Sequence, residues 1–210
     1  IGKTPSCAKL LKQLKVKKVV IGMMDPNKEA SGGIKQLKES NIEVCTNIML
    51  KECKDLLYPF IKWQKGTFIF YKMAQTLNGT IDGGYISSNQ TLAYVHSLRD
   101  KIDLLAIGGN TVRVDRPTLD TRYIQGNNPD VFIYSKNRIF DKKIPLFNIK
   151  NRDVIISDDL FKLLDYKFVM IEGSYNLLET LKERLDYIVL LVSPQMKMGL
   201  NITTQLNEKF

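Results

Sequence analysis

The chain has 210 residues, of which 44% are hydrophobic and 25% are charged. Both fractions are close to globular averages and exclude disordered and collagen-like chains. No apolar run approaches the ~18 residues that a membrane helix needs, and the first residues carry no signal-peptide pattern. We therefore expect no membrane partner. Because the first residue is Ile rather than Met, we also expect the natural start of the protein to be missing.

The positive charge is concentrated in the first third of the chain. Lys and Arg number 31 against 22 acidic residues, a net charge of +9, and residues 1–65 hold 13 Lys, no Arg and 6 acidic residues. A lysine-rich stretch without arginine is poorly suited to recognise nucleic acid, because bidentate contacts to phosphate and guanine favour Arg. We interpret this stretch as a solvated surface and expect no nucleic-acid partner; an anionic partner is the alternative.

The chain has three cysteines, Cys7, Cys45 and Cys53, with irregular spacing. An odd number without regular spacing indicates reduced thiols rather than a disulfide framework, so we expect a cytoplasmic protein. Taken alone, Cys7 is best interpreted as a small buried residue beside a turn.

The first part of the chain alternates helical patterns with short apolar runs. The pattern predicts helices over 8–14, 34–39 and 50–63, the last weakened near its end by Pro59, and strands over 18–25 and 42–44. Helices that alternate with strands indicate parallel pairing. The break at Gln64-Lys65-Gly66 predicts a boundary between a first domain, 1–65, and a second domain, 66–210.

The second part follows the same alternation, with turn signals at Asn78-Gly79 and Asp82-Gly83-Gly84. Strands are predicted over 67–74, 104–107, 131–134, 154–156, 168–171 and 187–192, and helices over 91–99, 158–164 and 175–185. Ser157 or Asp158 would cap the second of these helices. Asp115, Pro117 and Arg122 are expected on a long loop. The whole pattern indicates an α/β fold.

Three predicted strands run into small or polar residues and then into the expected start of a helix. The segments after them are Gly108-Gly109-Asn110-Thr111, Ser135-Lys136-Asn137-Arg138 and Glu172-Gly173-Ser174-Tyr175. Ligands of open α/β sheets bind at the carboxyl ends of strands, and free N–H groups at a helix start suit phosphate. None of the segments is a GxGxxG motif or a P-loop. Together they favour a nucleotide or phosphorylated ligand; a set of ordinary turns is the alternative.

Two further features carry charge or titratable groups. The segment from Asp115 to Arg122 is either a solvated loop or a phosphate clamp, in which Arg122 or Arg99 holds the anion with two parallel hydrogen bonds. The single histidine, His96, lies on a predicted helix and is best interpreted as an ordinary surface or core residue. One histidine argues against a Ser-His-Asp triad and against a His-rich metal site.

Several segments resemble one protein family. The first domain contains Gly2-Lys3-Thr4-Pro5-Ser6-Cys7-Ala8, Val19-Val20-Ile21-Gly22-Met23-Met24-Asp25-Pro26-Asn27, Gly33-Ile34 and Ile42-Glu43-Val44; the second contains Lys72-Met73-Ala74-Gln75-Thr76-Leu77-Asn78-Gly79, Gly108 with Thr111-Val112, Asp115 with Pro117, Leu119 and Arg122, and Glu172-Gly173. Together these segments resemble the bifunctional riboflavin-biosynthesis deaminase/reductase of bacteria.

The resemblance implies a fold and a reaction. Residues 66–210 would be an NADPH-dependent reductase domain, truncated at its C-terminus, with a dihydrofolate-reductase-like fold and a mixed, mostly parallel sheet. Residues 1–65 would be the last part of a cytidine-deaminase-like α/β domain. The reductase reduces the ribosyl group of 5-amino-6-(5-phosphoribosylamino)uracil, a phosphorylated pyrimidine, to a ribityl chain. Cys7 matches one zinc ligand, and one ligand cannot hold zinc, so zinc is expected only in the intact deaminase domain.

The resemblance also implies roles for individual residues. Cofactor contacts are implied for Ala74, Tyr85, Thr111, Asp115 and Ser135, a phosphate cradle for Ser174-Tyr175-Asn176, and substrate contacts for Gly83, Arg99, Leu119, Arg122 and Glu172. Gly83, Tyr85 and Ser174 depart from the residues common in the family, which are serine, tryptophan and glycine. For the chemistry itself we expect Asp115 to serve the proton transfer, with Lys72 as a supporting charge. Family members associate through the reductase domain, so a homodimer is expected.

Two other functions remain open. A related reductase acting on another pyrimidine or a pterin would share the fold. A non-catalytic module that holds an anionic polymer through residues 1–65 would bind less tightly as salt rises.

Overall fold

The computed structural model describes residues 6–27, 32–81, 86–173 and 175–201. The chain divides into two compact units, Ile1–Lys65 and Gly66–Phe210. Each unit is described by itself below.

The first unit packs two short helices and a pair of strands around a small core, and two further helices follow. Its elements are α1 (Cys7–Gln13), β1 (Lys18–Ile21), α2 (Gly33–Lys38), β2 (Glu43–Thr46), α3 (Leu50–Leu56) and α4 (Tyr58–Lys65). β1 and β2 pair in parallel, as predicted, with Lys18 opposite Glu43. The buried core consists of Ala8, Leu37 and Ile42. A core of this size leaves many apolar side chains of the unit exposed, including Val20 and Leu56.

Two predictions for the first unit are wrong in detail. The single helix predicted over 50–63 is two helices, because α3 ends at Leu56 and α4 begins at Tyr58. Pro59 is the second residue of α4. The N–H groups of the first helical turn have no acceptor within the helix, so a proline there costs no hydrogen bond and favours the start of a helix. Cys7, expected to be buried, is exposed at the start of α1.

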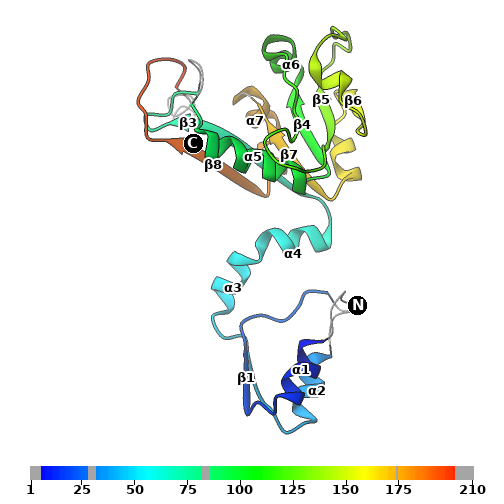
Figure 1. Ribbon diagram of the computed structural model, residues 1–210, viewed down its shortest axis with the longest axis vertical. Coiled ribbons are helices and arrows are strands. Elements are labelled where there is room, and N and C mark those ends of the chain that lie inside the picture. The colour runs from blue at the N-terminus through cyan, green and yellow to red at the C-terminus, as the bar shows by residue number, and fades with distance from the viewer. Residues whose placement is uncertain (1–5, 28–31, 82–85, 174, 202–210) are drawn as a thin grey trace. The chain divides into compact units, whose positions relative to one another are not determined.

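The second unit is built on one six-stranded sheet (Figure 1). Its elements are β3 (Phe68–Thr76), α5 (Asn89–Lys101), β4 (Leu104–Gly108), α6 (Gly109–Asp115), β5 (Asp130–Tyr134), η2 (Pro145–Asn148), β6 (Val154–Ser157), η3 (Leu160–Asp165), β7 (Phe168–Glu172), α7 (Tyr175–Leu181), η4 (Lys182–Arg184) and β8 (Tyr187–Ser193). The strand order is β6-β5-β4-β7-β3-β8, and all five neighbouring pairs are parallel. Among the described residues the one antiparallel contact is an isolated bridge between Thr80 and Asn201.

Helices cover both faces of this sheet. On one face, alternate strand residues such as Tyr71, Ala106 and Ile171 form a buried cluster with Leu177 and Leu181 of α7. On the other face, α5 buries Val95 and His96, and Figure 1 shows α5 in front of the sheet and α7 behind it. Strands buried on both faces explain why the sequence shows continuous apolar runs instead of strict alternation.

The order of the strands in the sheet brings the carboxyl ends of β4 and β7 beside the middle of β3. β7 lies between β4 and β3, although 59 residues separate the end of β4 from the start of β7. Lys72 on β3 pairs with Glu172 on β7, and Ile107 on β4 pairs with the same Glu172. Crevices outside the carboxyl ends of parallel strands are the usual ligand sites of such sheets.

Three predictions for the second unit need correction. Asp115 is not in a loop but is the last residue of α6. The described residues after β5, including Ser135 to Arg138, do not form the expected helix; the next helical turn is η2. The helix predicted over 158–164 is the 3₁₀ helix η3, capped by Asp159, whose carboxylate accepts from the N–H of Phe161 at 2.9 Å. In the part of the chain that the structure describes, no helix is long and apolar enough to cross a membrane.

Candidate functional site

A cavity of about 480 Å³ lies at the carboxyl ends of β4 and β7 and beside the middle of β3. Its volume is within the range typical of small-molecule sites. The lining residues are Lys72, Met73, Ala74, Ile81, Arg99, Ile107, Asn110, Thr111, Val114, Asp115, Pro117, Leu119, Glu172, Gly173 and Leu200. Both charged and apolar side chains line the cavity, which is the composition expected for a polar ligand with a flat ring.

Glu172 is the centre of a buried group of charges. Its carboxylate accepts two hydrogen bonds from Arg99, from Nε at 3.1 Å and from Nη2 at 3.0 Å. Lys72 Nζ lies 3.5 Å from Oε2 of the same carboxylate. The two-point contact with a planar guanidinium fixes the carboxylate in one orientation.

The local fold explains why these three charges meet. Lys72 and Glu172 are paired residues on neighbouring parallel strands, so their side chains leave the sheet on the same side. Arg99 comes from the last turn of α5, a helix that begins at Ser88, whose hydroxyl accepts from the N–H of Thr91 at 3.2 Å. A cation near a helix C-terminus is also favoured by the helix dipole.

The surroundings of Glu172 hold it in the ionised form. Burial alone would raise the pKa of this carboxyl group, but the charges of Lys72 and Arg99 and the hydrogen bonds from both outweigh burial, and the pKa is lowered to about 2. The cavity therefore contains a fixed negative charge at any pH at which the protein would work.

The α6 side of the cavity is more open. Asn110, Thr111 and Asp115 all line it, and Asn110 and Asp115 are exposed. Within the described residues no hydrogen bond or ion pair is recorded for the carboxylate of Asp115. A carboxylate without a partner among the described residues is available to contact a ligand.

Glycine is required where α6 approaches the end of β5. A Cβ atom on Gly109 would lie 2.6 Å from Oγ of Ser135, so any side chain there would push the two elements apart. Ser135 is buried, donates to the carbonyl of Asn137 at 2.6 Å and accepts from Arg113 at 3.3 Å. Neither Ser135 nor Gly109 lines the cavity, but Gly109 directly precedes the lining residues Asn110 and Thr111.

The turn after β7 is held by a buried tyrosine. Tyr71 donates from its hydroxyl to the carbonyl of Gly173 at 2.6 Å. Burial, and then the charge of Glu172, raise the pKa of this phenol, so Tyr71 stays a donor at neutral pH. Tyr175 and Asn176, which follow on α7, do not line the cavity, and the Tyr175 hydroxyl is hydrogen-bonded to Glu179 at 3.1 Å.

Arg122, expected to clamp phosphate, lies outside the lining of the cavity. Its Nε donates to Asp120 at 2.7 Å, and its side chain is half exposed. Asp120 directly follows the lining residue Leu119 and stands two positions before Arg122. Arg122 is therefore close to the site in sequence, but its recorded contact is local.

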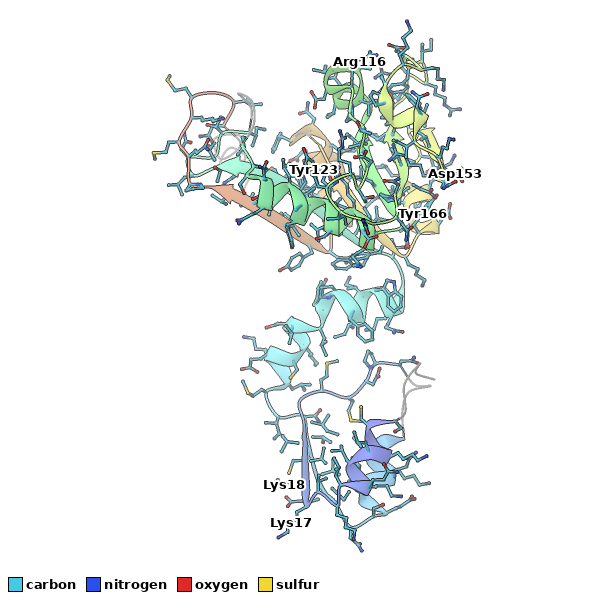
Figure 2. The ribbon with its side chains drawn as sticks, in the orientation of Figure 1. Lys17, Lys18, Arg116, Tyr123, Asp153 and Tyr166 are labelled. Atoms are coloured by element: carbon cyan, nitrogen blue, oxygen red, sulfur yellow. The ribbon has the colours of Figure 1, made fainter. Side chains whose placement is uncertain are left out.

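His96 is buried, as one of the two alternatives for a lone helical histidine predicts. It makes an edge-on contact with Tyr123, with ring centroids 4.7 Å apart, and Figure 2 shows Tyr123 beside α5. Its Nδ1 is buried and has no hydrogen-bond partner within the described residues. Burial, and then the charge of Arg99, lower the pKa of His96, so the ring is neutral at pH 7.

Seven of the residues singled out from the sequence line the cavity together. They are Lys72, Ala74, Arg99, Thr111, Asp115, Leu119 and Glu172. Ser135, Arg122, Tyr175 and Asn176 do not line it, and Gly83, Tyr85 and Ser174 lie outside the described residues.

Three other lining residues were named in the sequence analysis without an individual role: Asn110 and Gly173 in the segments after the strands, and Pro117 in the segment with Asp115. Met73, Ile81, Ile107, Val114 and Leu200 look in the sequence like any core residue, so no signal could have found them.

No metal site is formed by the described part of the chain. There, no three His, Cys, Asp or Glu side chains gather where they could hold an ion. Cys7 lies in the first unit, with Met23 and Asp25 among its neighbours around a small apolar pocket. The residues described do not fit a zinc ion, and no chemistry is assigned to one.

Comparison with known proteins gives consistent matches. The RibD C-terminal domain family matches residues 67–197. The riboflavin biosynthesis protein RibD of Synechocystis is 35% identical over 145 residues, which are 65% of this chain and 39% of that protein. The RibD protein of Actinobacillus pleuropneumoniae is 30% identical over 179 residues, 79% of this chain and 47% of that protein. The chain thus spans less than half the length of these relatives.

Solved structures agree with these matches. A diaminohydroxyphosphoribosylaminopyrimidine deaminase/5-amino-6-(5-phosphoribosylamino)uracil reductase from Thermotoga maritima has a TM-score of 0.71 and 26% identity, and the match covers 98% of this chain and 68% of that one. RibD of Acinetobacter baumannii has a TM-score of 0.64 at 22% identity, over 95% of this chain and 67% of that one. The second likeness concerns the fold alone. The fold class predicted from the sequence, a reductase domain with a mostly parallel sheet, is confirmed.

Proposed function

The chain belongs to the RibD C-terminal domain family, and on that premise we propose that residues 66–210 reduce 5-amino-6-(5-phosphoribosylamino)uracil in riboflavin biosynthesis. One observation carries the proposal. The cavity at the strand ends gathers seven residues to which the family resemblance gives cofactor, substrate or catalytic roles. The name of the Thermotoga maritima protein, whose fold this chain shares, supports the same reaction.

We propose that the charged group of the cavity binds the substrate. Arg99 and Lys72 are both held by Glu172, and each has further N–H donors, since a guanidinium carries five and an ammonium three. Because Glu172 already fixes both side chains, their remaining N–H groups can bind the hydroxyls and the phosphate of a phosphoribosyl group with little further loss of side-chain entropy. The apolar lining from Leu119 and Ile107 suits the flat face of a pyrimidine.

We propose that the α6 side of the cavity binds NADPH. A reductase of this family implies a nicotinamide cofactor, and the residues present fit one, because Asn110 and Thr111 offer neutral hydrogen-bonding groups. Ala74 adds a small apolar surface. When bound, the cofactor supplies the hydride that reduces the sugar carbon.

The residues of the chain must then manage charge and protons. C1′ of the ribosyl group becomes electrophilic only when the sugar ring opens to an imine, and the ring oxygen that is released needs a proton. We propose that Asp115 serves this proton transfer or stabilises the cationic imine, because it is the one carboxylate of the cavity without a recorded partner among the described residues. Lys72 supports it with a positive charge, although its recorded ion pair is with Glu172 rather than with Asp115.

A cofactor titration tests this proposal. Purified chain should bind NADPH, and binding should weaken when Thr111 is replaced by Val, which removes one hydroxyl at almost the same volume. The related-reductase alternative predicts NADPH binding but turnover with a different pyrimidine or pterin. The anion-binding alternative predicts no NADPH binding and an affinity for polyanions that falls steeply with salt. Absence of NADPH binding by folded protein would contradict the proposal.

We propose further that residues 1–65 are the last part of a deaminase domain, that the protein is cytoplasmic and that it forms a homodimer through the reductase unit. The match to the Thermotoga maritima deaminase/reductase over 98% of the chain supports the first point. The three free cysteines fit a reducing compartment. We predict that this chain binds no stoichiometric zinc. Metal analysis that finds about one zinc per chain, released by Cys7→Ser, would contradict that prediction.

A further inference from the structure

The segment that carries Leu119 into the cavity has an unusual set of backbone hydrogen bonds. Four successive carbonyl groups, from residue 117 to residue 120, each accept from a donor far away in the sequence. The pairs are Pro117 with Leu146 N–H at 3.1 Å, Thr118 with Arg152 Nη2 at 2.7 Å, Leu119 with Arg152 Nη1, and Asp120 with Arg99 Nη1 at 3.1 Å. The segment is not helix or strand, so these donors replace the pairing that regular structure would give.

The backbone of Leu119 needs such support. Its φ is 55°, in the left-handed region that a branched side chain rarely adopts, because the Cβ atom then approaches the backbone. Its side chain is only 4% exposed and lines the cavity. A residue in this conformation persists only where its surroundings determine it.

Arg152 binds two of these four carbonyl groups from outside the cavity. It lies two residues before β6, and besides the two carbonyls at 118 and 119 it donates to the carbonyl of Leu146 at 2.8 Å. The side chain is partly buried, and burial lowers its pKa to about 10, which leaves it charged at neutral pH. Only a planar fork of donors can reach three carbonyls in this way; an ammonium offers a single nitrogen.

We infer that Arg152 is a positioning residue of the substrate site: its guanidinium holds the backbone of Thr118 and Leu119 so that the Leu119 side chain forms the wall against which the substrate ring packs. The inference rests on the proposed function, because it assumes that the cavity takes that substrate. The same segment is joined at Asp120 to Arg99, and therefore to Glu172. Arg152 itself does not line the cavity.

Steady-state kinetics separates this role from a purely structural one. Arg152→Met should raise the KM for the phosphorylated pyrimidine about tenfold or more, with kcat changed little and NADPH affinity unchanged. Arg152→Lys should recover part of the loss. Arg184→Met is the matched control, because Arg184 stacks on Phe161 at 4.7 Å and has no recorded contact with the 117–120 segment. A KM in Arg152→Met that equals the control's would overturn the inference.

A double substitution sharpens the test. Glycine adopts the left-handed region freely. Leu119→Gly therefore removes the side chain that packs against the substrate ring and also removes the need for Arg152 to hold the backbone. In that background Arg152→Met should raise KM far less than it does alone. Equal effects of Arg152→Met with and without Leu119 would show that Arg152 acts elsewhere, and would overturn the inference.

A second readout does not depend on activity. The Cα chemical shift of Leu119 reports its backbone conformation, so it should move in Arg152→Met, or in Arg152→Lys if the first variant does not fold, and stay constant in Arg184→Met. An unchanged shift would overturn the inference even if the chain reduces its substrate. If the shift moves but the unmodified chain shows no reductase activity, the anchoring stands and the proposed function fails.

Discussion

Glu172 and Asp115 line the same cavity, but Glu172 is buried against two cations whereas Asp115 is exposed at the end of a short helix. The carboxylate of Glu172 has its hydrogen bonds to Arg99 already formed, and its pKa is lowered to about 2. No partner for Asp115 is recorded in the described part of the chain. The difference separates two roles: a charge that never changes can orient the groups around it, and a charge without a partner can respond to a ligand.

Asp115→Asn is expected to have the largest effect on activity. If Asp115 serves the proton transfer, the substitution should lower kcat by about 10²–10⁴-fold, the usual range for general acid–base help, and should leave NADPH affinity within a few-fold. Stopped-flow or steady-state NADPH oxidation in the full-length protein measures this. Collapse of NADPH binding with normal turnover at saturating cofactor would make Asp115 a cofactor anchor instead.

Glu172→Gln is expected to have the largest effect on stability. The substitution leaves Arg99 and Lys72 close together, mostly buried and without their anion, which should cost about 3 kcal/mol. Urea denaturation measures the loss. Asp115→Asn, at an exposed position, should stay within about 0.5 kcal/mol and is the matched control. Equal stabilities of the two variants would remove the contrast between the two carboxylates.

The pH dependence of that difference follows from the lowered pKa. A carboxyl group with a folded pKa of about 2 and an unfolded pKa of 4.5 contributes stability above pH 4.5, and the contribution is lost as the pH falls toward 2. The gap between wild type and Glu172→Gln should therefore be constant near neutral pH and shrink in acid.

Arg122→Ala tests whether the charged part of the site extends beyond the cavity. As a phosphate clamp, Arg122 should contribute about 2 kcal/mol to substrate binding and little to NADPH binding. Its present contact with Asp120 would have to open for this role. Titration of a substrate analogue against both proteins measures the difference. A change within about 0.5 kcal/mol would make Arg122 a solvated loop residue.

His96 should give the smallest of these effects, and one confined to acid pH. Burial lowers the pKa of His96 in the folded protein. Below about pH 6.5 the unfolded chain therefore takes up a proton that the native ring does not, and the free energy of unfolding decreases as the pH decreases. His96→Gln should flatten the stability profile between pH 7.5 and pH 5.5. Since the chain has one histidine, a slope that survives the substitution would have to come from another group.

Much of the fold follows from local sequence. Runs such as Leu104 to Ile107 and Val169 to Ile171 are apolar and short, and their alternation with helical patterns indicates parallel strands. A helix start was expected after β4, but the extent of α6 was not predicted, because Gly109, Thr111 and two valines are poor helix formers. Its helix is stabilised by tertiary packing, with Val112 fully buried.

The site was predictable only in part. The family resemblance pointed to Lys72, Arg99 and Glu172, but their mutual contact depends on the register of β3 against β7, which local sequence does not encode. Arg152 carried no signal at all, because its partners are backbone carbonyls and any sequence supplies those. Side chains that support a loop from a distance are visible only in the folded structure.

Turnover of the substrate itself tests the central claim most directly. Folded chain mixed with NADPH and 5-amino-6-(5-phosphoribosylamino)uracil should oxidise NADPH and yield the ribitylamino product in equal amounts, and Asp115→Asn should abolish most of this while still binding NADPH. NADPH oxidation that does not depend on the pyrimidine, or wild-type turnover matched by Asp115→Asn, would contradict the account.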